Sequence, residues 1–305
     1  MSLPTVTLND GNKIPVIGFG TGSSLYGKDA TEYVDHALEA GFSHIDTAAI
    51  YKNEASVGEA IRASGLERSD LWVTTKYDGG DILQGIQTSL GKLGLKSVDL
   101  YLIHFPRLVS SDFEGAWEEF EKLKKDGLTK SIGVSNFSVQ DLKTVVNSGS
   151  ITPSVNQIRL HPYNYASYKD LFAYSAQHNI VIEAYGSLAP ITTYPGGPVD
   201  KVLASIAKRI GGTPAQVIFK WVIAKGAVVV TTTSKESRLK EYLAVADLPD
   251  LTADEIAAID EAGAKGPSST SQAVARASFC ALFTLSLASV YFFMLSPMAL
   301  TRRSC

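Results

Sequence analysis

Short apolar runs alternate with amphipathic stretches along residues 1–265. Continuous apolar runs predict buried strands, and apolar residues three or four positions apart predict helices. The apolar runs lie at residues 17–21, 43–46, 71–76, 98–104, 130–135, 154–158, 180–185 and 227–231. The helical patterns lie at residues 30–39, 54–63, 82–93, 113–125, 139–147, 168–177, 213–224 and 236–245. Each run is followed by a helical pattern, so the chain is predicted to contain eight strand–helix units.

This alternation predicts an α/β fold with an all-parallel sheet covered by helices. Eight units within about 250 residues are typical of a closed (β/α)8 barrel, the TIM barrel. Two further helical patterns, 199–210 and 253–262, fall outside the cycle and predict auxiliary helices. Asp10-Gly11, between the runs 5–8 and 13–17, predicts an N-terminal β-hairpin.

A doubly wound sheet is the alternative fold. Gly18, Gly20 and Gly22 are spaced almost like a dinucleotide-binding fingerprint, and Asp46 stands where a ribose-binding acid would. The third glycine comes one residue early, however, and eight units are too many for one Rossmann half. The glycines are better explained by a tight turn in a strand-end loop.

Composition and charge limit the partners of the chain. Of its 305 residues 45% are hydrophobic, which is enough for a large core, and the net charge is −3 without any basic block. Nucleic acid is therefore not expected as a partner. Both cysteines lie beyond residue 279 and the five histidines are scattered, so we expect no disulfide framework and no metal site.

The C-terminal segment departs from this pattern. Residues 277–300 contain no charged side chain and are rich in apolar ones. A membrane-spanning helix needs about 20 residues, so this segment is either a tail anchor or an apolar tail that packs loosely on the barrel or aggregates. We divide the chain into a barrel, 1–267, and a tail, 268–305. No signal peptide precedes the barrel, so we expect a cytoplasmic enzyme, with residues 277–300 as its candidate membrane anchor.

Polar side chains occur at the exits of the predicted strands, which meet on one face of a (β/α)8 barrel. Asp46 and Lys76 end neighbouring strands and can pair, and Tyr51 follows Asp46 by five positions. A nearby ammonium group lowers the pKa of a phenol from its usual value of about 10. His104 can donate a hydrogen bond to a substrate oxygen. This group suits a general acid for carbonyl reduction, with hydride supplied by a cofactor.

Several ordered segments at these strand ends resemble the aldo-keto reductase family, and the resemblance runs from about residue 8 to residue 266. They are Asp46-Thr47-Ala48-Ala49-Ile50-Tyr51-Lys52-Asn53-Glu54, Thr75-Lys76, Leu102-Ile103-His104-Phe105-Pro106, Ile132-Gly133-Val134-Ser135-Asn136-Phe137 and Val155-Asn156-Gln157-Ile158-Arg159-Leu160-His161-Pro162-Tyr163. The segments resemble in particular those of fungal members that reduce α-keto amides, α-keto esters and aldehydes. The resemblance implies NADPH-dependent reduction of an aldehyde or activated ketone. We expect a monomer that takes a small carbonyl substrate.

The resemblance also implies roles for individual residues. The catalytic residues would be Asp46, Tyr51, Lys76 and His104. The residues that bind NADPH or NADP+ would be Gly20, Thr21, Asp46, Ser135, Asn136, Gln157, Tyr185, Gly186, Leu188, Ser234, Lys235, Arg238 and Glu241. Two of these, Lys235 and Arg238, begin the last barrel helix and suit a dianionic 2′-phosphate, which favours NADPH over NADH.

Five positions depart from the family pattern: Gly22 stands where an aromatic residue is frequent, Thr232-Thr233 where many relatives have Lys-Ser, Tyr242 where many have asparagine, and Phe105 where some have tryptophan. These positions concern the substrate pocket and the phosphate site rather than the reaction. A second function remains open, a non-catalytic NADPH-binding regulatory subunit on the same barrel. Turnover of NADPH with an activated ketone would distinguish the two.

Overall fold

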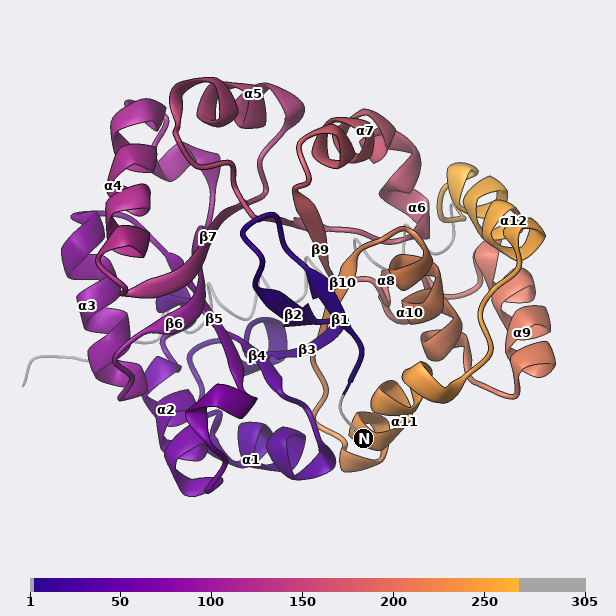
Figure 1. The fold of residues 1–305 in the computed structure, drawn as a ribbon. Helices are drawn as coiled ribbons and strands as arrows, with labels where there is room; N and C mark the ends of the chain where they lie inside the picture. Colours follow the sequence, from indigo (N-terminus) through magenta and orange to yellow (C-terminus); the bar gives the residue numbers. More distant parts are fainter. Residues whose placement is uncertain (1–2, 269–305) are drawn as a thin grey trace, which may run out of the picture.

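The structure is a computed structural model that describes residues 3–268. Eight parallel strands form a closed barrel in the order β10-β3-β4-β5-β6-β7-β8-β9 (Figure 1). The strands are β3 (Ile17–Gly20), β4 (His44–Asp46), β5 (Trp72–Tyr77), β6 (Val98–Ile103), β7 (Thr129–Ser135), β8 (Val155–Arg159), β9 (Val181–Tyr185) and β10 (Val228–Thr231). The predicted (β/α)8 barrel is confirmed, and the doubly wound alternative is wrong.

Helices surround the barrel and connect its strands. They are α1 (Thr31–Ala40), α2 (Glu54–Ala63), α3 (Ile82–Leu93), α4 (Phe113–Lys125), α5 (Val139–Ser148), α6 (Pro162–Tyr165), α7 (Lys169–Gln177), α8 (Ala189–Thr192), α9 (Val199–Ile210), α10 (Pro214–Ala224), α11 (Glu236–Leu243) and α12 (Ala253–Ala264). Single 3-10 turns are η1 (Ser23–Leu25), η2 (Ala49–Tyr51), η3 (Arg68–Asp70), η4 (Pro106–Leu108), η5 (Ala166–Tyr168) and η6 (Ala244–Asp247). Helices α6 and α8 lie in loops for which the sequence pattern predicted no helix.

The predicted antiparallel hairpin is formed by β1 (Thr5–Thr7) and β2 (Lys13–Pro15). It closes the N-terminal end of the barrel (Figure 1). Gly11 has a φ of +86°, a conformation that glycine adopts without steric cost. Leu8 and Ile14 are buried against barrel residues that include Leu100 and Val155. The hairpin therefore seals one end of the barrel and leaves the other end for the site.

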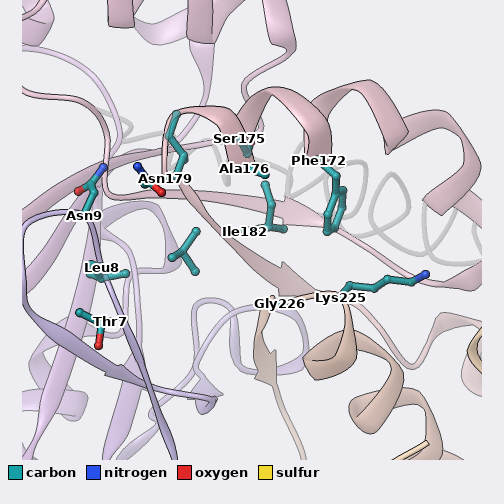
Figure 2. A pocket seen from close by; sticks show the side chains of 12 residues that line it. Thr7, Leu8, Asn9, Phe172, Ser175, Ala176, Asn179, Ile182, Lys225 and Gly226 are labelled. Carbon is teal, nitrogen blue, oxygen red and sulfur yellow. The ribbon is translucent and has the colours of Figure 1, made fainter. Parts of the chain in front are cut away.

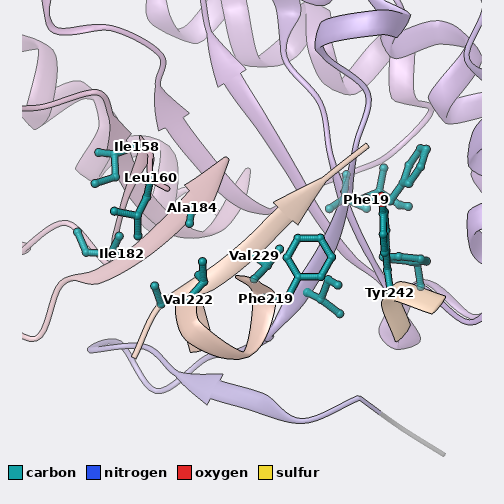
Figure 3. Close-up of a cluster of buried hydrophobic side chains, with 14 of the residues drawn as sticks. Phe19, Ile158, Leu160, Ile182, Ala184, Phe219, Val222, Val229 and Tyr242 are labelled. Atoms are coloured by element: carbon teal, nitrogen blue, oxygen red, sulfur yellow. The ribbon is translucent and has the colours of Figure 1, made fainter. Parts of the chain in front are cut away.

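The apolar residues form one layer inside the barrel and another between the strands and the helices. Successive residues of a strand point to opposite faces. Val228 accordingly packs inside with the hairpin, whereas its neighbour Val229 packs outward. Figure 3 shows Val229 beside Phe219 and Val222 of α10. This double layer explains why the strands were recognisable as continuous apolar runs.

The two auxiliary helices pack against each other beside the barrel (Figure 1). Arg209 of α9 pairs with Glu255 in the first turn of α12. Thr252 caps α12, because its hydroxyl accepts from the Glu255 backbone N–H. A Cβ atom on Gly263 would lie 2.2 Å from the Pro162 carbonyl oxygen, so α12 needs glycine where it meets α6.

Between residues 3 and 268, no helix is both long enough and apolar enough to cross a membrane. The predicted membrane segment, 277–300, lies outside the described residues. The division of the chain at residue 267 stays a prediction.

Candidate active site

Asp46 and Lys76 form a buried ion pair at the C-terminal end of the barrel. Asp46 is the last residue of β4 and Lys76 the penultimate residue of β5, and the two strands are neighbours, since Asp46 pairs in register with Thr74. The Nζ atom of Lys76 lies 2.7 Å and 2.8 Å from the two Asp46 carboxylate oxygens and 2.9 Å from the Thr47 carbonyl oxygen. These three acceptors match the three N–H donors of an ammonium group, which explains how Lys76 is fully buried.

The Tyr51 ring lies between this ion pair and His104. Tyr51 belongs to η2, the turn that follows β4. Its ring centroid is 5.2 Å from Lys76 Nζ and 5.6 Å from the His104 ring, which it meets edge to face. A Cβ atom added to Gly22 would lie 3.2 Å from the Tyr51 hydroxyl oxygen and 2.9 Å from the ring carbon that carries it. The absence of a side chain at Gly22 thus leaves room for the phenol.

Burial raises the pKa of Tyr51 above its usual value, while the Lys76 ammonium opposes this change. The sequence-based expectation of a net lowering is therefore wrong for the protein alone, because desolvation of the phenolate outweighs the nearby positive charge. The pKa of Lys76 is itself raised: burial would lower it, but the contacts with Asp46 and Tyr51 outweigh burial. Lys76 is thus a permanent cation beside a protonated phenol.

His104 is a neutral imidazole at physiological pH. Burial, assisted by Lys76 and Arg107, lowers its pKa to about 3. Its Nδ1 atom is buried and has no hydrogen-bond partner among the described residues. An N–H group without an acceptor is costly, so we place the ring proton on Nε2. A neutral ring of this kind can donate one hydrogen bond without competing for the proton of Tyr51.

A second buried carboxyl group lies beneath the ion pair. The Gln157 Nε2 atom is 2.7 Å from Asp46 Oδ2 and 2.7 Å from Glu183 Oε2. Burial and the nearby Asp46 raise the pKa of Glu183 to about 8. Glu183 is not among the site residues predicted from the sequence. The available signal was a carboxylate within an apolar strand, since Glu183 is fully buried in β9.

Ser135, Asn136 and Tyr185 form a connected hydrogen-bond network beside Gln157. The Ser135 hydroxyl donates to the backbone carbonyl oxygen of Gln157 at 2.9 Å, and Asn136 Nδ2 lies 3.0 Å from that hydroxyl. The Tyr185 hydroxyl donates to Asn136 Oδ1 at 2.9 Å. Asn136 holds a φ of +62°, which Asn tolerates better than most residues. The structure thus brings together four residues that were predicted to bind the cofactor.

A cleft of about 600 Å³ opens beside these groups, a size typical of small-molecule sites. The predicted site residues that line it are Gly20, Asp46, Tyr51, Gln157, Tyr185, Gly186, Leu188 and Arg238. Arg159 and Ser187 also line it, although the sequence analysis did not assign them to the site. Ser187 is 3% exposed, and its hydroxyl has no hydrogen-bond partner within residues 3–268.

Six predicted cofactor residues are not part of the cleft lining: Ser135 and Asn136 of the hydrogen-bond network, and Thr21, Ser234, Lys235 and Glu241. Thr21 is fully buried and its hydroxyl donates to Thr47, so its side chain supports the loop and offers no contact to a ligand. The Glu241 carboxylate accepts from the Thr213 hydroxyl at 2.6 Å. Ser234 and Lys235 are exposed just before α11. Their contacts with the cofactor stay predictions.

Another cavity, of about 550 Å³, lies between the hairpin and α7 (Figure 2). Its lining includes Leu8, Phe172 and Ser175. The basic side chain in its lining, Lys225, is paired with Asp260 at 2.6 Å. No acid–base group resembling the Tyr51 cluster is present in this lining, so the chemistry belongs to the cleft at the C-terminal end.

Comparisons with known proteins agree with this geometry. The model of the Aldo/keto reductase family matches residues 16–264. An aldo-keto reductase of Mycolicibacterium vanbaalenii is 44% identical over 264 residues, which cover 85% of this chain and 92% of that protein. A NAD/NADP-dependent indole-3-acetaldehyde reductase of Schizosaccharomyces pombe is 37% identical over 84% of this chain and 93% of its own. The crystal structure of a Bombyx mori aldo-keto reductase in complex with NADP matches with a TM-score of 0.77 and 31% identity, covering 86% of this chain and 93% of that protein.

Proposed function

The chain belongs to the aldo-keto reductase family, and we propose that it reduces aldehydes and activated ketones to alcohols with NADPH. The observation that carries this proposal is the buried Lys76–Asp46 pair beneath a protonated Tyr51, next to a neutral His104. When bound, the nicotinamide supplies a hydride to the carbonyl carbon.

The residues of the cleft fit a nicotinamide cofactor. Gln157 and Tyr185 line its inner part, and the buried Ser187 hydroxyl has no partner among the described residues. Arg159 and Arg238 add positive charge to the lining, which suits phosphate groups. Gln157 and Asn136 would hold the carboxamide, Tyr185 would stack on the ring, and the loop at Gly186 would approach the pyrophosphate.

Tyr51 donates the proton in this mechanism. Its hydroxyl transfers a proton to the carbonyl oxygen as negative charge develops there, and Lys76 stabilises the phenolate that remains. Asp46 holds the Lys76 ammonium in place through two hydrogen bonds. His104, with its proton on Nε2, donates to the same carbonyl oxygen and orients it. Each residue thus has one role that depends on its protonation state.

The preference for NADPH over NADH belongs to the proposal. Arg238 and Lys235 lie at the N-terminal end of α11, where the helix dipole and two cations favour a phosphate dianion. The family resemblance assigns the adenosine 2′-phosphate to this region. Discrimination would then arise at α11, far from the reacting atoms.

Turnover of the purified protein tests the proposal. NADPH oxidation and alcohol formation are measured together with a panel of aldehydes, α-keto esters and α-keto amides. We expect equal amounts of NADP+ and alcohol from at least one class. If the protein binds NADPH but no member of the panel is reduced, the non-catalytic regulatory function becomes the better account.

A further inference from the structure

Gln157 lies between two buried carboxyl groups that come from different strands. Its Nε2 atom faces Asp46 Oδ2 of β4 and Glu183 Oε2 of β9, each at 2.7 Å. Gln157 and Asp46 are 2% exposed and Glu183 is fully buried. A primary amide has two N–H donors, and each of them here has a carboxyl acceptor. The amide oxygen is therefore the group that Gln157 can present to the cleft.

We propose that Glu183 is a positioning residue: together with Asp46 it holds the amide oxygen of Gln157 toward the cleft, where that oxygen accepts a hydrogen bond from the carboxamide amine of the nicotinamide. The inference rests on the proposed function and deepens it. The orientation matters because a reversed Gln157 amide would present N–H donors to another N–H donor. Glu183 itself does not touch the cofactor.

Glu183 is needed because Asp46 is already engaged. Both Asp46 oxygens accept from Lys76 Nζ, and Oδ2 also accepts from Gln157. Without Glu183, one buried N–H group of Gln157 would lose its acceptor, and such a group favours any rotation that restores one. A rotated amide would no longer offer its oxygen to the cleft.

Burial and the nearby Asp46 of β4 raise the pKa of Glu183 to about 8 and so keep its carboxyl group neutral, although Lys76 of β5 and the hydrogen bond from Gln157 of β8 act to lower that pKa. His44 of β4 also faces Glu183. A protonated Glu183 can accept from Gln157 through Oε2, while Oε1 faces His44 Nε2 at 3.4 Å. Burial lowers the pKa of His44 to about 4, so its ring is neutral and can accept a hydrogen bond from the O–H group of Glu183. The site thus avoids a second buried negative charge beside Asp46.

The test compares two ligands on the full-length protein. NADP+ carries the carboxamide, and adenosine 2′,5′-bisphosphate has the adenine and 2′-phosphate without the nicotinamide. Dissociation constants are measured by titration calorimetry for the wild type, Glu183→Leu and Glu183→Gln. Glu183→Leu removes the acceptor at similar volume, and Glu183→Gln keeps one. Where Glu183→Leu does not yield a folded barrel, the more adaptable Glu183→Met replaces it.

We expect Glu183→Leu to raise the dissociation constant of NADP+ by about threefold to tenfold, which corresponds to the loss of one neutral hydrogen bond. Its affinity for the bisphosphate should stay at the wild-type value, and Glu183→Gln should bind both ligands as the wild type does. In a Gln157→Leu background, Glu183→Leu should add no further loss, because its effect passes through Gln157.

Three results would overturn the inference: unchanged NADP+ affinity in Glu183→Leu, an equal loss for both ligands, or an undiminished loss in the Gln157→Leu background. An equal loss would mean that Glu183 supports the barrel as a whole. A wild-type protein that binds the bisphosphate but not NADP+ would overturn the proposed function, and this inference with it.

Discussion

At the scale of single residues, the site depends on a few side chains whose protonation states differ from those of exposed groups. Burial favours the neutral forms of Tyr51, His104 and Glu183, whereas Lys76 stays charged because three oxygens surround its ammonium group. A general acid that is protonated at neutral pH is available for donation at every turnover. The cation beside it stabilises the phenolate that proton transfer creates.

A substitution at Gly22 tests how much displacement of the Tyr51 ring the reaction tolerates. In Gly22→Ala, the new Cβ atom would come within 2.9 Å of the Tyr51 ring, so the ring must move. We expect kcat to fall about tenfold or more, with little change in the NADPH dissociation constant, because misplaced catalytic groups slow the chemical step. Ser24→Ala, in the same loop, is the matched control and should retain activity. A Gly22→Ala enzyme with wild-type kcat would show that the phenol tolerates displacement.

At the scale of elements, β4, β5, β8 and β9 each contribute one member of a continuous polar chain: Asp46, Lys76, Gln157 and Glu183. Asp46 and Lys76 come from adjacent strands, as do Gln157 and Glu183, and the hydrogen bond between Asp46 and Gln157 joins the two pairs across the barrel. The loops supply Tyr51 and the groups that line the cleft. The barrel therefore fixes the acid–base support, and the loops determine which substrate reaches it.

Helix α11 tests cofactor preference. We expect Lys235→Ala combined with Arg238→Ala to weaken the binding of NADPH far more than the binding of NADH, because a charge-assisted hydrogen bond to phosphate contributes roughly 1.5–3 kcal/mol. Lys240→Ala lies on the same helix and is the control for a general loss of positive charge. Binding titrations with both cofactors decide the matter: an equal loss for NADPH and NADH would place the 2′-phosphate elsewhere.

The sequence predicted elements better than contacts. The eight barrel strands, the hairpin and the two auxiliary helices produce periodic patterns, and the structure has them close to the expected positions. Short helices such as α8 have too few residues for periodicity to be visible. The role of Glu183 and the net change in the Tyr51 pKa depend on burial within the closed barrel, which no local pattern encodes.

At the scale of the whole molecule, the buried Glu183 should make stability depend on pH. Its folded-state pKa of about 8 lies above the ordinary value of 4.5, so its contribution is full below pH 4.5 and is lost as the pH rises toward 8. We expect the free energy of unfolding of the wild type, relative to Glu183→Gln, to decrease between about pH 5 and pH 8. Urea unfolding of both proteins at three pH values measures this difference. A constant or rising difference would mean that Glu183 is ionised in the folded barrel.

The C-terminal tail should be dispensable for catalysis. Helix α12 ends at Ala264, and no proposed catalytic or cofactor residue follows Glu241. We expect a chain truncated after Gly266 to keep wild-type kcat and KM for its carbonyl substrate. Fractionation of the full-length and truncated proteins tests the anchor at residues 277–300: a tail anchor predicts that only the full-length chain sediments with membranes. Loss of activity on truncation would show that the tail completes the site.

The central claim is that Tyr51 donates the proton in carbonyl reduction, and the most direct measurement compares the wild type with Tyr51→Phe. Single turnover of bound NADPH with a saturating aldehyde is recorded for both proteins, together with their NADPH dissociation constants. We expect turnover to fall by about 10²–10⁴-fold, the usual cost of losing a general acid, while NADPH affinity stays nearly unchanged. Turnover of Tyr51→Phe at the wild-type rate would contradict the account.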